Sequence, residues 1–278
     1  MKRIIAILLA LIITASDTTI SAQSSKPTRR LSPVSGYITS PFDSNIDKLP
    51  ANFRGHYIEG VYLAIKALTP PRGEYEKTGE YFARLAQHAG KKQYAFRYDP
   101  EIDKGWVKYD ADAGTLKVSG YSLGVFECEF TSHYVTMELQ KLSRTVGGSY
   151  PLLDSKDSIS YYIASNSFGR KVRVKRARRI SYKIADNKKL PDWHFELKVA
   201  PAEAYRLKPS LSVLFVCDLA ISKIVPLMTF EYIYHSEPTI SEPEEYIVTE
   251  RCLMVNVREI WLFNRQTGEV YQRQKLES

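Results

Sequence analysis

The stretch Leu211–Ile221, LSVLFVCDLAI, is the longest near-continuous apolar run in the chain once the N-terminus is set aside. Pro209 precedes it and Ser222 follows it. A run of this length that is rich in Val and Phe, with a helix breaker at one end, is typical of a strand covered on both faces rather than of a helix. We therefore expect it to be the central strand of a sheet.

The composition around this strand is that of an ordinary globular protein. Of the 278 residues, 44% are hydrophobic, and no Gly/Ser-rich or Pro-rich linker divides the interior. We expect residues 41–278 to form a single α+β domain that is helical over 52–90 and β-rich over 91–278. The predicted fold is two N-terminal helices packed on a mainly antiparallel, twisted β-sheet.

Residues 1–22 have the composition of a secretory signal peptide. A charged start, an apolar core and small residues at a plausible cleavage site follow one another: Lys2 and Arg3, Ile4–Ile13, Ser21 and Ala22. At ~1.5 Å per residue this core covers only about half of a bilayer's hydrocarbon, so it is short for a membrane anchor. The sequence predicts a periplasmic or secreted protein with no transmembrane segment after cleavage. Residues 23–40 are predicted to form a flexible arm.

The basic character belongs to the exported part of the chain. The whole chain has 39 Lys and Arg against 31 Asp and Glu, and removal of Lys2, Arg3 and Asp17 with the signal leaves 37 and 30, a formal charge of +7. Three cysteines, Cys128, Cys217 and Cys252, allow at most one intramolecular disulfide in a compartment that permits disulfides. Cys217 and Cys252 could pair if their strands are adjacent, although buried thiols explain both equally well.

Two segments before residue 91 have helical periodicity. Apolar residues recur at helical spacing from His56 to the Pro70–Pro71 pair, at Ile58, Val61, Tyr62, Ile65 and Leu68. His56 falls on the polar side and is expected to be solvated. Thr78 is predicted to cap a second helix that ends at Gly90. Its expected inward residues are Tyr81, Phe82 and Leu85.

This second helix carries a motif, G-E-[FY]-E-x-T followed by Y-x-x-R, at Gly73–Thr78 and Tyr81–Arg84. Further pieces are the turn Ser165–Gly169, and Trp261 with Thr267–Val270 near the end. With these motifs the chain resembles a group of uncharacterised secreted bacterial proteins. It departs from their pattern in having Lys77 before the Thr78–Gly79 pair, where two Thr are usual. The resemblance implies a shared exported fold and brings no activity, cofactor or site residue.

Beyond Gly90 the pattern changes to short aromatic and β-branched runs, which predict strands. Trp106–Tyr109 and Thr115–Val118 flank a predicted hairpin turn. Its alternating carboxylates do not make a calcium loop, because the Gly and Glu that such a loop requires are missing. In Trp193–Val199, apolar residues are expected to face inward and His194 outward. No His or Cys spacing predicts a metal site, and we expect no cofactor.

Gly120–Gly124, GYSLG, matches the nucleophile elbow of serine hydrolases, with Asp218 and His235 downstream in the usual order. Such an elbow must open a helix, whereas Val125–Phe130 alternates like a strand. The chain also lacks the alternation of strands and helices that a doubly wound sheet requires. We therefore predict a non-enzymatic protein, with a secreted serine hydrolase that uses Ser122 as the alternative.

The most unusual segment is strongly basic. Its seven basic residues are Arg170, Lys171, Arg173, Lys175, Arg176, Arg178 and Arg179. Val172 and Val174 could point inward from a strand while its charges form a ridge along one edge of the sheet. The functional interpretation is an anion-binding site. The structural interpretation is that the charges protect an edge strand from aggregation, or that they pair with an acidic loop. That loop contains Glu237, Glu242, Glu244 and Glu245.

Export decides which anions are candidate partners. We expect an exported binding or envelope accessory protein that contacts an anionic envelope polymer, anionic lipid head groups, a host polymer or another protein, ahead of nucleic acid. The alternative outside catalysis is a purely structural or interaction protein with no small-molecule site. The sequence does not distinguish these partners.

Overall fold

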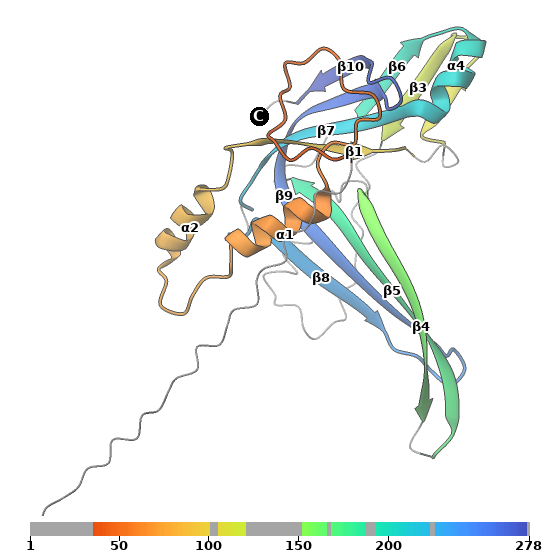
Figure 1. Ribbon diagram of the computed structural model, residues 1–278. Helices are drawn as coiled ribbons and strands as arrows, with labels where there is room; N and C mark the ends of the chain where they lie inside the picture. The colour runs from red at the N-terminus through yellow and green to blue at the C-terminus, as the bar shows by residue number, and fades with distance from the viewer. Residues whose placement is uncertain are drawn as a thin grey trace, which may run out of the picture. The chain divides into compact units, whose positions relative to one another are not determined.

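Two β-sheets make up most of the described chain in the computed structural model (Figure 1). The structure describes residues 36–100, 105–120, 152–165, 168–186, 193–222 and 226–276. The larger sheet contains β1 (Gln93–Tyr98), β4 (Asp154–Ser165), β5 (Lys171–Asp186), β7 (Leu211–Leu219), β8 (Thr229–Ser236), β9 (Glu244–Asn264) and β10 (Val270–Lys275). The smaller contains β2 (Val107–Asp110), β3 (Thr115–Gly120) and β6 (Trp193–Lys198). The helices are α1 (Ile58–Leu68), α2 (Thr78–Ala86), α4 (Pro201–Leu207) and the 3-10 turn η2 (Lys208–Ser210).

This architecture confirms a mixed, strand-rich fold with antiparallel sheets. Within the described ranges, every strand pair is antiparallel except β5 with β9, which is parallel. Among the residues that the structure places, no helix combines the length and apolarity needed to cross a membrane.

The central strand of the larger sheet is β9, not β7 as the sequence predicts. The first half of β9 pairs with β5 and β8, and its second half pairs with β7 and β10. Its 21 residues include charged ones such as Glu250, Arg251 and Arg258, so its apolar pattern is interrupted in the sequence. β7 lies between β1 and β9 and is buried on both faces, which confirms the expected interior strand.

One side of helix α1 packs against the larger sheet. Ile58, Tyr62 and Ile65 are buried in the same core as Tyr182 of β5 and Leu253 of β9. Leu68, which the spacing predicts to point inward, is exposed at the end of the helix. In α2 the buried residues are Tyr81 and Leu85, while Phe82 is also exposed.

His56 is buried, contrary to the prediction that it is solvated. It precedes α1 instead of lying in its first turn. Its Nδ1 accepts the Ala95 backbone N–H at 3.0 Å, so its Nε2–H donates to the Ser40 carbonyl at 2.9 Å. Burial lowers the pKa of His56, which favours this neutral ring. His56 therefore joins the N-terminal segment to β1 as a structural residue.

The smaller sheet follows the expected pattern. β2 and β3 form the predicted hairpin, in which the Asp110 carboxylate accepts the Ala113 N–H at 3.0 Å. β6 adds to β3 with Trp193 and Phe195 buried and His194 exposed, as the alternation predicts. At Gly120 an added Cβ would lie 2.0 Å from the Trp193 ring, so this glycine allows the indole to pack on β3.

Cys217 and Cys252 are free, buried thiols, although their strands are adjacent. Cys217 pairs in register with Val257, five residues beyond Cys252 on β9. The side chain of Cys217 also packs in the core with Tyr62, whereas Cys252 packs in a separate cluster with Met254. These positions exclude a disulfide between the two. Cys128 lies outside the described residues.

Candidate functional site

The basic segment lies on an interior strand, which corrects the expectation that it forms a ridge along an edge. β5 pairs with β4 on one side and with β9 on the other. β4 is the edge strand in the described sheet order. The valines and charges of this segment do not predict that β5 is an interior strand. Its second neighbour, β9, lies far away in the sequence, so the pairing is set by long-range contacts.

Three of the basic side chains have carboxylate partners on neighbouring strands. Lys175 lies 3.2 Å from Glu244, and Arg176 lies 2.6 Å from Glu245. Arg179 lies 2.7 Å from Asp157 of β4. Glu244 and Glu245 begin β9, where parallel pairing places them beside Lys175 and Arg176. Two carboxylates of the predicted acidic partner therefore do contact the basic segment. Among the described residues, no carboxylate forms an ion pair with Lys171, Arg173 or Arg178.

The basic residues divide between the two faces of the sheet, so they do not form one patch. Lys171, Arg173, Lys175 and Arg179 share a face with alternate residues of β4 and β9, since paired residues in a sheet point to the same side. We call this surface the aromatic–basic face. Its apolar members are Ile159, Tyr161 and Ile163 of β4, Tyr246 of β9 and Tyr234 of β8.

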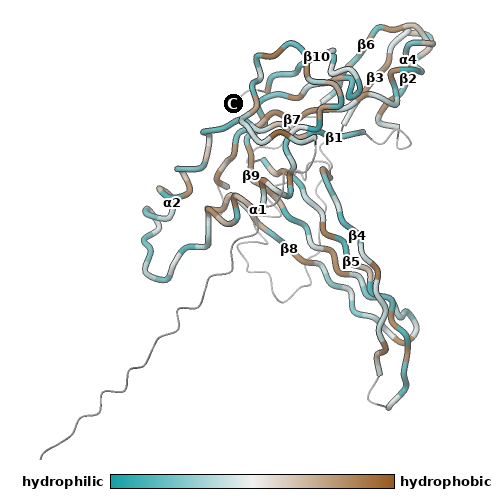
Figure 2. Tube along the Cα trace, viewed as in Figure 1, coloured by the Kyte–Doolittle hydropathy of each residue, from teal (hydrophilic) through white to brown (hydrophobic). Residues whose placement is uncertain are grey.

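Large apolar side chains are exposed across this face. Ile159 is 61% exposed and Ile163 is 63% exposed, and hydrophobic segments recur along β4 and β5 in Figure 2. The guanidinium of Arg173 lies 4.4 Å from the centre of the Tyr161 ring, within cation–π range. These two residues, with Lys175, Pro243 and Glu244, line a hollow of about 330 Å³.

The tip of the β4–β5 hairpin extends the same surface. Phe168 is 92% exposed there, next to the exposed Arg170 and Lys171. The loop between β8 and β9 lies at this end of the sheet too, because the Lys175 N–H donates to the Pro243 carbonyl at 2.9 Å. That loop carries the exposed Ile240. Apolar and basic side chains therefore lie together at this end.

The opposite face of β5 carries Arg176 and Arg178 in a different environment. Arg176 lies 4.5 Å from the Tyr162 ring centre and pairs with the buried Glu245, which also lies 2.8 Å from His235 Nε2. Burial would raise the pKa of Glu245, but hydrogen bonds from Arg176, His235 and Tyr162 lower it overall. This cluster neutralises Arg176 and leaves the aromatic–basic face as the better candidate for anion binding.

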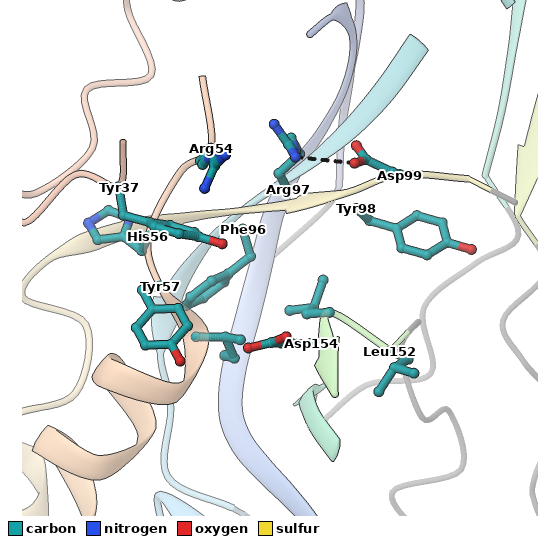
Figure 3. Close-up of a pocket in the computed structure, with 12 residues that line it drawn as sticks. Tyr37, Arg54, His56, Tyr57, Phe96, Arg97, Tyr98, Asp99, Leu152 and Asp154 are labelled. Carbon is teal, nitrogen blue, oxygen red and sulfur yellow. Dashed lines mark hydrogen bonds and ion pairs between the residues drawn. The ribbon is translucent and has the colours of Figure 1, made fainter. Parts of the chain in front are cut away.

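A second candidate site is a pocket of about 200 Å³ (Figure 3). It lies between the N-terminal segment, β1 and the start of β4. Its lining residues are Tyr37, Arg54, His56, Tyr57, Ile58, Phe96, Arg97, Tyr98, Asp99, Leu152, Leu153 and Asp154. Sequence reasoning missed this pocket, because its residues come from separate segments and no spacing or motif links them.

Ser122, the nucleophile of the alternative serine hydrolase, lies outside the described residues. Its predicted partners, Asp218 and His235, do not meet. Asp218 pairs with Asn256 and His235 with Ile247, nine residues apart along β9, or about 30 Å. Asp218 instead lies 2.7 Å from Arg258. The structure thus separates the two residues that would have to act together.

No group of three His, Cys, Asp or Glu side chains that could hold a metal ion occurs in the part of the chain that the structure describes. No family model, curated protein or solved structure matches the chain. The resemblance to secreted bacterial proteins stays a prediction from short motifs.

Proposed function

We propose that this protein is an exported, non-enzymatic envelope accessory protein that binds an anionic lipid surface through the aromatic–basic face and the tip of the β4–β5 hairpin. The signal-like residues 1–22 support export to the periplasm or beyond. The proposal includes the finer fold expected from the sequence, two N-terminal helices packed on a twisted, mainly antiparallel sheet. The observation that carries it is that Lys171 and Arg173 share their face with the exposed Ile159 and Ile163.

The apolar members favour a lipid surface over a soluble polymer. A polyanion would bind the basic residues and could stack on Tyr161, but it would offer Ile163 and Phe168 no apolar environment. At a membrane interface, each of these side chains contributes up to about 1.5–3 kcal/mol by leaving water. Each Lys or Arg near an anionic leaflet adds about 1 kcal/mol. Aromatic rings that carry a polar group, such as that of Tyr161, suit the head-group region.

Pairing with acidic residues accounts for Lys175 and Arg176, but protection of an edge strand is a weak explanation of the remaining charges. Charges that prevent aggregation belong on an edge strand, and β5 is an interior strand. The edge strand β4 carries its described charges, Asp154, Lys156 and Asp157, at its beginning. The stretch from Ile159 to Ile163, which is mostly exposed, has no charge. Aggregation control therefore does not account for where the basic residues lie.

Vesicle flotation tests the proposal. The purified protein is mixed with phosphatidylcholine vesicles with or without phosphatidylglycerol, and we expect binding to the anionic vesicles that weakens steeply with salt. Replacing Arg170, Lys171 and Arg173 together with Gln should weaken binding roughly 100-fold, at about 1 kcal/mol per charge. The matched control replaces the exposed Lys48, Lys91 and Lys92 with Gln, which removes the same charge elsewhere and should have much less effect.

A second pair of variants distinguishes lipid insertion from simple charge attraction. Ile163→Ser and Phe168→Ser leave the charge unchanged and should each weaken vesicle binding. A different outcome would show that the lipid proposal is wrong and that the partner is an anionic polymer. In that outcome both variants bind vesicles like the wild type, and the wild type binds heparin as strongly as it binds anionic vesicles. Salt-insensitive binding, or equal binding to neutral vesicles, would reject the basic residues as the site.

The non-enzymatic part of the proposal has its own test. A fluorophosphonate probe labels activated serines, so we expect no labelling of the folded protein. Labelling that disappears in Ser122→Ala would establish the serine hydrolase instead.

A further inference from the structure

The pocket beside α1 has charges of opposite sign on its two sides. Arg54 and the ion pair of Arg97 with Asp99 lie along one side and Asp154 on the other, with Phe96 between them (Figure 3). The pocket shares no lining residue with the aromatic–basic face. An explanation of this second site must account for both charges.

The basic side is held in place by neighbouring groups. Arg97 donates to the Phe53 carbonyl at 3.0 Å and lies 3.2 Å from the Asp99 carboxylate. Arg54 lies 5.6 Å from the centre of the Tyr37 ring. No carboxylate among the described residues forms an ion pair with Arg54, so this exposed guanidinium keeps its capacity to bind an anion.

The acidic side is a single half-buried carboxyl group. No basic side chain of the described residues lies within ion-pair distance of Asp154, and the nearby Lys156 pairs with Glu59 instead. Burial raises the pKa of Asp154, although the Ser155 backbone N–H and the charge of Lys156 act to lower it. A ligand cation at this position would supply the missing partner.

Aromatic rings occupy the space beside these charges. The rings of Tyr37 and Tyr57 lie 5.2 Å apart, and the buried Phe96 lies beside His56. Tyr98 also lines the pocket. The volume of about 200 Å³ is below the range of pockets for drug-sized ligands, and it suits a molecule of the size of one amino acid.

We propose that this pocket binds a free α-amino acid or a zwitterion of that size. Its carboxylate pairs with Arg54, beside the Arg97–Asp99 ion pair, its ammonium group pairs with Asp154, and its side chain lies against Phe96 and the tyrosines. A simple anion would leave Asp154 unpaired, and a simple cation would leave the Arg54 guanidinium without an anion. A neutral sugar would compensate neither charge. A zwitterion satisfies both sides at once.

Calorimetry and thermal unfolding test this proposal with leucine and phenylalanine as probes. We expect binding of both, and a loss of affinity of about tenfold or more for N-acetyl-leucine, which lacks the ammonium group, and for leucinamide, which lacks the carboxylate. Arg54→Gln should weaken leucine binding by a similar factor and leucinamide binding little. Asp154→Asn should weaken leucine binding and N-acetyl-leucine binding little.

Exposed residues of the same type provide the controls. Arg72→Gln and Asp112→Asn make the same chemical changes outside the pocket and should bind leucine like the wild type. Each variant's circular dichroism spectrum and Tm without ligand show that it is folded. Equal affinity for leucine and N-acetyl-leucine would reduce the pocket to an anion site and overturn the zwitterion proposal. Failure of every standard amino acid to bind or to raise the Tm would overturn it as well.

Discussion

The hydroxyl of Tyr182 donates a hydrogen bond of 3.0 Å to the carboxylate of Glu59, although the two residues are 123 positions apart. The same hydroxyl accepts a hydrogen bond of 2.8 Å from Arg251. Lys156 and Tyr57 also donate to Glu59. One carboxylate on α1 therefore joins the helix to β4 and β5, and through Tyr182 to β9.

Removing this charge should destabilise the protein. In Glu59→Gln the neutral amide cannot accept as strongly from Lys156 and Tyr182, and we expect the free energy of unfolding at neutral pH to fall by about 1–2 kcal/mol. Urea unfolding followed by circular dichroism measures this. Glu74→Gln changes an exposed carboxylate in the same part of the chain and should stay within about 0.5 kcal/mol of the wild type.

The same carboxylate predicts a pH dependence. Burial would raise the pKa of Glu59, but hydrogen bonds from Lys156, Tyr57 and Tyr182 lower it below the ordinary value of 4.5. A lowered folded-state pKa means that the stabilisation is complete above pH 4.5 and is lost as the pH falls through the folded-state value. Wild type and Glu59→Gln should therefore converge in stability in acid. A constant difference at every pH would contradict this.

Alanine substitutions at two glycines with the same backbone φ distinguish the cost of backbone strain from the cost of a steric clash. Gly268 and Gly169 both have φ of +77°, but an added Cβ would lie 1.9 Å from the Leu49 carbonyl oxygen at Gly268 and meet nothing within 4 Å at Gly169. Gly169→Ala should cost about 1–2 kcal/mol from backbone strain alone. Gly268→Ala should cost at least about 2 kcal/mol more, because backbone atoms must move. Equal costs in urea unfolding would refute the close approach at Leu49.

The two described cysteines should be unreactive in the folded protein. Both are buried, and burial raises the pKa of Cys217 and raises that of Cys252 to about 12. In a Cys128→Ser background, Ellman's reagent should report no thiol under native conditions and two thiols after denaturation. Fast native labelling would show that one of them is accessible. Absence of both thiols after denaturation without reductant would reveal a disulfide that the register excludes.

The exposed tip should be dispensable for folding. Phe168→Ala changes a side chain that is almost fully exposed and should alter the free energy of unfolding by no more than about 0.5 kcal/mol. Phe215→Ala makes the same change in the core and should cost about 3–5 kcal/mol. A large effect of Phe168→Ala would mean that this ring packs inside the protein. Phe168 would then not be available for the proposed membrane contact.

The type of an element with a clear local hydrophobic period could be predicted from the sequence, but the elements that pack against it could not. The hairpin around Asp110–Gly114, the alternation in Trp193–Val199 and the interior strand at Leu211 follow from patterns within each segment. The predicted environments of His56 and Phe82 are wrong, because the start of α1 and the packing of α2 depend on residues elsewhere in the chain.

For the candidate sites, the sequence by itself determined that basic and apolar residues alternate along Lys171–Lys175, which in a strand turns the two kinds of side chain to opposite faces. Only the tertiary structure decided that this strand is interior, that Glu244 and Glu245 neutralise part of it, and that Ile159 and Ile163 share its face. It alone brought Arg54, Arg97 and Asp154 around one pocket. The physical reason is that strand order and register are set by long-range pairing and burial, which no local pattern encodes.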